Sequence, residues 1–237
     1  MRKKWIIIGA SLLVLIAAVW GGSAIYANVE NGRALDELAL STPATTSAAP
    51  ATAGAAATDA PATTADATDL AGTWTVADGS QAGYRVKEVL NGQDVTVVGR
   101  TTGVTGTATV EGTSLTAATV TVDMKNVTTD NSSRDGQFLG ILKTSEFPTS
   151  TFTLTGPVDI GAISNGVATV QAPGELTVAG VTQKVTATLS AQVTADGVEV
   201  QGSIPVTFKD YGIDAPNLGF VKVENTGTIE MLLKLGR

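Results

Sequence analysis

The sequence has neither histidine nor cysteine among its 237 residues. Without histidine the chain has no Ser-His-Asp triad, no imidazole base and no histidine-ligated zinc. Without cysteine it has no thiol nucleophile, iron–sulfur cluster, disulfide or lipid-modified N-terminal cysteine. We therefore expect no catalytic residue, no metal site and no cofactor, in a protein that is not an enzyme.

Phosphate-binding motifs are lacking as well. The chain has no glycine-rich loop followed by Lys and a helix, and no dinucleotide-binding fingerprint. Carboxylates remain for acid–base chemistry, and Asp123, Asp130, Asp135 and Glu146 are close in sequence. A glycosidase is therefore kept as an alternative, which needs two carboxylates facing each other across a cleft.

Positive charge is scarce beyond the N-terminus. The chain has 15 Lys and Arg against 22 Asp and Glu, and three of the cations precede residue 28, so the remainder has 12 cations, 22 anions and a net charge of −10. Because such a surface repels polyphosphates, we expect no nucleic-acid partner.

Long uncharged runs are absent except at the N-terminus. Arg2, Lys3 and Lys4 precede a stretch without charge from Trp5 to Ala27. This length suffices for a membrane-spanning helix, and the basic cluster predicts a cytoplasmic N-terminus. Residues 1–27 are thus predicted to be a transmembrane anchor of a single-pass membrane protein whose C-terminal domain lies outside the cytoplasm. A cleaved signal peptide, which would yield a secreted protein, is the alternative.

Residues 28–71 are predicted to be a linker. From Ser41 to Ala71 the sequence is almost entirely Ala, Thr, Pro, Ser and Asp, with too little apolar bulk to offset the entropy cost of ordering. We expect a disordered tether that lets the following domain reach the membrane.

Residues 72–237 are predicted to form an all-β domain. Apolar and polar residues alternate over residues 117–125, 185–193, 198–208 and 228–235, which indicates half-buried strands. Glycines within strands suit a coiled sheet, and the Cys and Trp spacing of immunoglobulin domains is absent. We expect an extended antiparallel β-barrel rather than a β-sandwich.

One segment breaks this alternation, "NSSRDGQFLGILKTSEF", residues 131–147. Asn131 or Ser132 can cap a short helix with an apolar side that includes Phe138 and Leu142. The helix either closes the core or acts as a lid over one end of the sheet.

Five blocks in order resemble the YceI-like family: "GTWTVADGSQAGYRVKE", "VGRTTGVTGTATV", "VTVDMKNVTTDNSSRDGQFLGILKTSEFPTSTFTL", "GELTVAGVTQKVTATL" and "GSIPVTFKDYGI". The resemblance covers residues 72–237 and implies a lipocalin-like barrel that holds a polyisoprenoid chain in a long apolar cavity, without catalysis. The chain departs from it in having no His in "YRVKEVL", which puts a head-group contact of that kind in doubt.

With this resemblance, bulk and strand parity indicate the residues that contact a ligand. The candidates are Tyr84, Val86, Val120, Val122, Phe138, Phe147, Phe152, Leu176, Val178 and Phe208. Arg134 and Asp135 are expected to form a structural pair, with contact of Arg134 to an anionic head group as the alternative.

The hypothesis is a membrane-tethered protein that binds an isoprenoid or other long-chain lipid, for transport, storage or stress protection. The alternative is a cell-surface structural or adhesion β-sandwich without a cavity. Predicted partners are the lipid and, through the N-terminal helix, the membrane, with homodimerisation left open.

Overall fold

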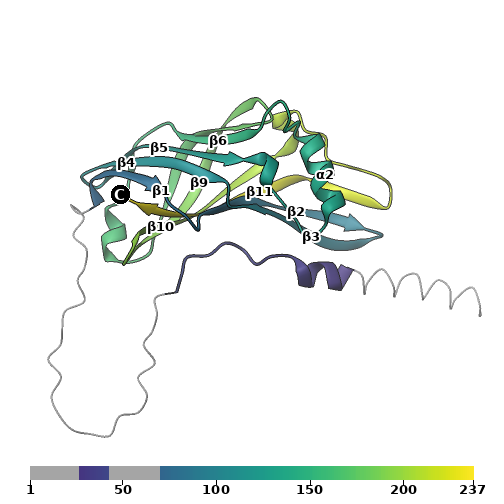
Figure 1. Ribbon diagram of the computed structural model, residues 1–237, viewed down its shortest axis with the longest axis horizontal. Coiled ribbons are helices and arrows are strands. Elements are labelled where there is room, and N and C mark those ends of the chain that lie inside the picture. The colour runs from purple at the N-terminus through teal and green to yellow at the C-terminus, as the bar shows by residue number, and fades with distance from the viewer. Residues whose placement is uncertain (1–26, 43–69) are drawn as a thin grey trace, which may run out of the picture.

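The computed structural model describes residues 27–42 and 70–237, and its main body is an antiparallel β-barrel (Figure 1). The strands are β1 (Gly72–Val76), β2 (Gln81–Leu90), β3 (Gln93–Thr101), β4 (Val104–Glu111), β5 (Ser114–Asp123), β6 (Thr149–Leu154), β7 (Val158–Asp159), β8 (Ala168–Val178), β9 (Val181–Thr194), β10 (Gly197–Thr207) and β11 (Val221–Gly236). The helices are α2 (Ser132–Ile141) and the short 3-10 helices η2 (Met124–Asn126), η3 (Gly161–Asn165) and η4 (Phe208–Tyr211).

The sheet closes because β1 pairs with β4 on one side and with β11 on the other. From β4 the ring continues through β5, β6, β8, β9 and β10 back to β11. These eight strands form a closed antiparallel barrel, so the predicted barrel is confirmed and the sandwich is not. The four segments with predicted alternation are the bodies of β5, β9, β10 and β11.

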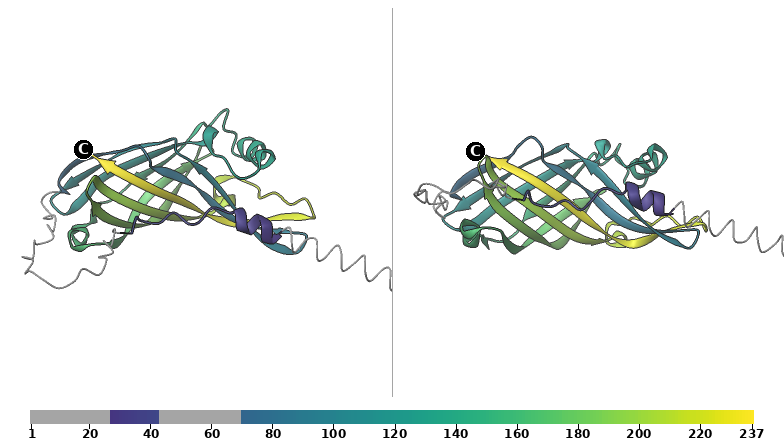
Figure 2. Two further views of the ribbon diagram at one scale, coloured as in Figure 1. Left: turned by 60° about the horizontal axis from the view of Figure 1, so that its bottom comes forward. Right: turned by 90° about the horizontal axis from the view of Figure 1, so that it is seen from below.

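The two ends of the barrel differ. At the end that carries the C-terminus, β1 joins β11 at Thr75 and Gly236. Towards the other end β2 takes the place beside β11, with β3 outside it. The outer edge of β3 pairs with no strand among residues 70–237 and meets only an isolated bridge between Arg100 and Thr128. We call this end the mouth, and α2 lies there (Figures 1 and 2).

Side chains fill the end opposite the mouth. Ala172 and Ala187 have no exposed surface, and the indole of Trp74 is buried with its Nε1 donating to the carbonyl of Leu70 at 2.8 Å. Small residues and large ones form a buried hydrophobic core here.

Residues 27–42, here called the strap, lie along the outer wall of the barrel. Residues 27–33 are helical, and residues 35–42 are extended (Figure 2). Asn31 satisfies the free edge of β3, because its Nδ2 donates to the carbonyl of Asp94 at 2.9 Å and its Oδ1 accepts from the amide of Thr96 at 2.8 Å. An unpaired strand edge invites pairing with other chains, and this amide covers part of it.

A buried ion cluster lies beneath the strap. Glu230 is 5% exposed, accepts a hydrogen bond from the Nε of Arg85 at 2.6 Å and forms an ion pair with the Nη1 of Arg100 at 2.7 Å. Each guanidinium also donates to the strap, Arg85 to the carbonyl of Leu35 at 2.8 Å and Arg100 to that of Asp36 at 2.9 Å. Two cations share one carboxylate, and a strap carbonyl accepts one further hydrogen bond from each of them.

The strap's far end is held by Glu199. Its Oε2 accepts from the amide and the hydroxyl of Ser41, both at 2.7 Å, and from Gln192 at 2.9 Å. The linker prediction gave residues 28–42 no such contacts. The remaining linker residues, 43–69, and the predicted anchor up to Tyr26 lie outside the described residues. Within the described ranges, no helix combines the length and apolar character that crossing a bilayer requires.

A glycine allows the barrel wall to pack against the helix at the mouth. Tyr84 of β2 lies opposite Gly99 of β3, where a Cβ atom would approach the Tyr84 Cε1 to 2.3 Å. The other face of the Tyr84 ring stacks on Phe138 of α2, with centroids 4.9 Å apart. The glycine therefore sets the depth of the ring, and the ring supports the helix.

Replacing Gly99 by alanine should displace the Tyr84 ring and destabilise the barrel by about 1–3 kcal/mol, as overpacking usually does. Urea denaturation measures the change. The control is Gly136→Ala in α2, where a Cβ meets nothing within 4 Å. That change should be neutral or stabilising by up to about 1 kcal/mol, because alanine favours the helix. Equal effects of the two substitutions would contradict the packing argument.

Docking of the strap should weaken in acid. Burial raises the pKa of Glu199, but the hydrogen bonds from Ser41 and Gln192 outweigh burial and lower it below the ordinary value of 4.5. A lowered folded-state pKa gives stability that is present above the ordinary value and lost as the pH falls through the folded-state value. Protection of the Ser41 amide from exchange, measured relative to its intrinsic rate at each pH, should therefore fall below about pH 4.5. A Glu199→Gln variant should lose this dependence, and an unchanged profile would contradict the prediction.

Candidate functional site

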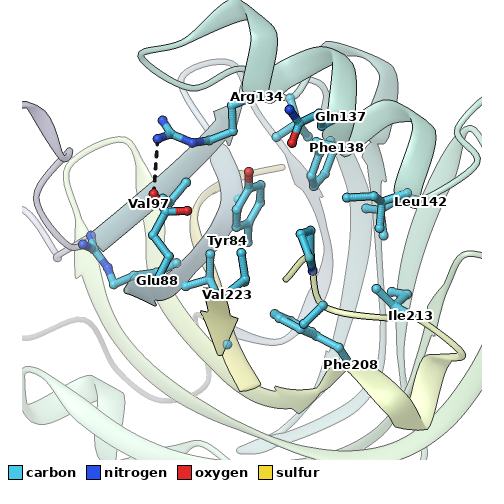
Figure 3. A pocket seen from close by; sticks show the side chains of 18 of the residues that line it. Tyr84, Glu88, Val97, Arg134, Gln137, Phe138, Leu142, Phe208, Ile213 and Val223 are labelled. Atoms are coloured by element: carbon cyan, nitrogen blue, oxygen red, sulfur yellow. Dashed lines mark ion pairs between the residues drawn. The ribbon is translucent and has the colours of Figure 1, made fainter. Parts of the chain in front are cut away.

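A cavity of about 460 Å³ lies inside the mouth. Its wall is formed by β2, α2, η4, β11 and the segment from Ile213 to Val223, with contributions from β3, β5, β6, β8, β10 and η2 (Figure 3). This volume falls within the range of about 300–1,000 Å³ found for small-molecule sites. The cavity occupies the half of the barrel that the core does not fill.

The wall is mostly apolar. It is lined by Tyr84, Val86, Leu90, Val97, Val122, Met124, Val127, Phe138, Ile141, Leu142, Val178, Val206, Phe208, Tyr211, Ile213, Leu218, Phe220, Val221, Val223 and Ile229, and its charged or amide side chains are Arg85, Glu88, Asn131, Arg134 and Gln137. Figure 3 shows Arg134, Glu88 and Gln137 near one another on one side of the cavity, with Phe208 and Ile213 on the other. An apolar chamber with a few polar groups at one side suits an amphiphile.

The structure places six of the ten predicted contact residues at this wall. They are Tyr84, Val86, Val122, Phe138, Val178 and Phe208. Whether they contact a ligand stays a prediction.

The other four lie elsewhere. Val120, Phe152 and Leu176 belong to the packed core, at 8%, 6% and 3% exposure. The ring of Phe152 lies where a Cβ on Gly174 would be, 2.3 Å from its Cε2. Phe147 lies against Gly180 at the β8–β9 turn. Strand parity gave the correct face for the strand residues, but it does not show where along the barrel the core ends.

Helix α2 lies over the cavity, in the position expected of a lid. Asn131 caps it by accepting from the amides of Ser133 and Arg134, as the sequence predicted. None of its residues is buried, although Phe138 and Ile141 line the cavity. A helix that closed the core would bury its apolar side, so α2 covers the chamber instead of filling it.

The predicted pair of Arg134 and Asp135 is wrong. Adjacent residues of a helix point in different directions. Asp135 instead accepts from the amide and the hydroxyl of Thr129, at 2.8 and 2.7 Å, which ties the preceding loop to the helix.

Arg134 lies among three carboxylates from three parts of the chain. Asp130 is 2.6 Å from its Nη1, while Glu88 of β2 and Glu30 of the strap are 3.6 and 3.8 Å from its Nη2. Arg33 in turn lies 3.6 Å from Glu30. The guanidinium thus joins the lid, the barrel wall and the strap.

Burial shifts the pKa values of two ionisable groups beside Arg134. Burial raises the pKa of Glu88, which the charge of Arg134 opposes and those of Glu30 and Asp130 reinforce. Burial likewise raises the pKa of the Tyr84 phenol. Both shifts favour the neutral forms of groups that line the cavity.

Sequence reasoning missed part of the wall. Glu88 and Leu90 share strand parity with Tyr84 and Val86, so the alternation of β2 could have shown them. The segment of residues 213–223 has no period of two, and only the tertiary fold brings it to the mouth.

Comparison with known proteins agrees with this geometry. A family model described as YceI-like domain matches residues 74–235. A polyisoprenoid-binding domain from Saccharophagus degradans, implicated in plant cell wall breakdown, is 19% identical, with a TM-score of 0.55 over 69% of this chain and 97% of that one. BcnA of Burkholderia cenocepacia is 16% identical, with a TM-score of 0.53 over 67% of this chain and 96% of its own. None of the curated proteins matches the sequence.

The raised pKa of Glu88 predicts a pH-dependent stability. A raised folded-state pKa gives stability that is present below the ordinary value of 4.5 and lost as the pH rises through the folded-state value. Glu88→Gln imitates the protonated form, so its stability relative to the unsubstituted protein should rise from pH 4 to pH 7. The rise should be roughly 1 kcal/mol for each tenfold increase that folding causes in the proton affinity of Glu88.

Urea denaturation of both proteins across this range measures the difference. The control, Glu111→Gln, alters an exposed carboxylate at the end of β4 and should show no such trend. A relative stability of Glu88→Gln that falls with pH would mean that attraction to Arg134 dominates.

Proposed function

The chain belongs to the YceI-like domain family, and we propose that it binds a long-chain lipid, an isoprenoid or similar amphiphile, in the cavity at the mouth of its barrel. The observation that carries the proposal is the apolar chamber of about 460 Å³ at one end of a barrel that has a buried hydrophobic core. The name of the similar Saccharophagus degradans domain, a polyisoprenoid-binding domain, supports this ligand class.

The polar side of the cavity favours a neutral head group. Arg134 already pairs with Asp130 and faces Glu88 and Glu30, so carboxyl groups occupy the positions around its guanidinium. A phosphate there would be repelled by these carboxylates. A hydroxyl or carbonyl group, by contrast, can exchange hydrogen bonds with Gln137 or with the Tyr84 phenol.

The role is that of a carrier or store of lipid without catalysis. Neither Asp135 nor Glu146 lines the cavity, so the geometry does not support a glycosidase. The adhesion alternative has no support in a closed barrel with a chamber.

The place of action in this proposal is the outer face of a membrane. The uncharged stretch from Trp5 to Ala27 anchors the chain, and the cations before it keep the N-terminus in the cytoplasm. The lipid then comes from the bilayer that holds the anchor.

Filling the cavity should abolish lipid binding. Val86→Trp adds a large ring inside the chamber, whereas Val89→Trp on the same strand lies outside the cavity wall. Mass spectrometry of lipids extracted from the purified protein should find a long-chain neutral lipid with the unsubstituted protein and with Val89→Trp, but less than about a tenth as much with Val86→Trp, because the chamber no longer admits the chain.

Circular dichroism confirms that both variants fold. Equal lipid content in the two variants, or none in the unsubstituted protein, would contradict the proposed function.

A further inference from the structure

Three large apolar side chains that are exposed to solvent lie at the mouth. Within residues 27–42 and 70–237, the most exposed large apolar side chains are Val29, Leu35, Ile141, Val167, Val193, Leu218 and Phe220. Leu218 and Phe220 are 60% and 58% exposed, and with Ile141 they also belong to the cavity wall. We call these three residues the rim. Side chains that belong both to the cavity wall and to the surface mark the entrance.

The backbone holds the rim next to the β2–β3 turn. The amide of Asn91 in this turn donates to the carbonyl of Phe220 at 2.8 Å, and Val221 pairs with Leu90. The amide of Leu218 donates to the carbonyl of Val221 at 2.8 Å, which closes the turn between them. The segment therefore presents Leu218 and Phe220 on a supported hairpin.

The strap brings the N-terminal stretch to the same end. Asn31 binds the edge of β3 at Asp94 and Thr96, and Glu30 faces Arg134 of the lid. In Figure 2 the helical residues 27–33 lie at the mouth end, and the C-terminus lies at the other end. Asn31, whose side chain binds the barrel, thus lies only four positions after Ala27, the end of the uncharged stretch.

Residues 43–69 do not set the distance between the barrel and the membrane, because they come after the strap in the sequence. They follow the strap, and the strap already contacts β3 at Asn31 and reaches Glu199 and Gln192 at Ser41. A tether placed after the docked segment cannot lengthen the connection before it. This replaces the long tether expected from composition with a short, oriented connection.

We propose that the rim of Ile141, Leu218 and Phe220 docks onto the bilayer that holds the N-terminal stretch, with the strap orienting the barrel mouth-first. Lipid then passes between bilayer and cavity without crossing water. The proposal rests on the proposed function for its anchor and its ligand. Docking is apolar rather than electrostatic, because the part of the chain beyond residue 27 has a net charge of −10.

Single cysteines test the orientation, since the chain has none of its own. The full chain with Leu218→Cys, labelled with an environment-sensitive nitrobenzoxadiazole group, is reconstituted in phosphatidylcholine vesicles that contain doxyl-labelled lipid. The control is Val167→Cys, equally exposed at 60% and next to η3 at the end away from α2 (Figure 1). We expect quenching at residue 218 and none at residue 167. Equal quenching at both sites, or none at residue 218, would overturn the proposal.

The strap's part is tested in the same assay. A double variant, Asn31→Ala with Glu199→Ala, removes the side chain that binds the β3 edge and the carboxylate that binds Ser41, and should reduce quenching at residue 218 toward the level at residue 167. Unchanged quenching would show that the strap does not orient the barrel.

Loading kinetics separate this proposal from the proposed function. With geranylgeraniol in the vesicles as the probe, Leu218→Ser combined with Phe220→Ser should slow loading about tenfold, because the rim no longer buries apolar surface in the bilayer. Val167→Ser should leave the rate unchanged. Because Leu218 and Phe220 also line the cavity, each loading rate is compared with the same variant's binding of geranylgeraniol from detergent, and a rate that falls no further than this binding does would overturn the docking. If every variant loads as fast as the unsubstituted protein, the docking proposal is overturned. If the unsubstituted protein binds no geranylgeraniol from detergent, the proposed function is overturned, while the quenching result still decides whether the rim docks.

Discussion

The pairing of β1 with both β4 and β11 is the constraint from which the rest of the structure follows. It closes the sheet at one end, where a ring of eight strands is narrow enough for side chains to fill. Towards the mouth β2 and β3 continue the wall, but the outer edge of β3 has no strand beside it in the described part of the chain. The barrel therefore has one solid half and one half that needs other elements to cover it. The cavity, the lid and the attachment of the strap all lie at this second half.

Polar contacts hold those covering elements together. Arg134 extends from the lid to Glu88 of the wall and Glu30 of the strap, so movement of α2 changes contacts with both. Taking such charges partly out of water has a cost, and pairing offsets it only while the partners stay in place. The Gly99–Tyr84–Phe138 stack supports the same helix from inside. A lid without buried residues, whose contacts with the wall and the strap include one guanidinium and one ring stack, is suited to opening for a lipid more readily than the core could unfold.

Much of the fold could be predicted because its causes are local. The period of two in β5, β9, β10 and β11 and the cap at Asn131 were readable in the sequence. The site residues could be predicted only in part. The alternation of side chains along a strand shows which of them point into the barrel, but it does not show where the core ends and the cavity begins. Phe152 fills space beside Gly174, whereas Tyr84 beside Gly99 borders the chamber, and both are aromatic residues on inward faces. The strap was not readable, because its contacts join side chains to backbone atoms 50 or more residues away.

The position of the mouth decides how the energetics of lipid exchange work. Burying a chain from water gains about 0.8 kcal/mol per methylene, so ten buried carbons would be held by about 8 kcal/mol against release into water. A carrier that had to cross this barrier both when it takes up the lipid and when it releases it would exchange lipid too slowly to be useful. A bilayer is as apolar as the cavity, so exchange with it is close to balanced provided that the chain never crosses water. The chemistry of the wall then needs to supply only a small preference, through the shape around Phe138 and Phe208 and the polar groups beside Arg134. Orientation toward the membrane would therefore do more for the transfer rate than tighter binding could, because tighter binding slows release.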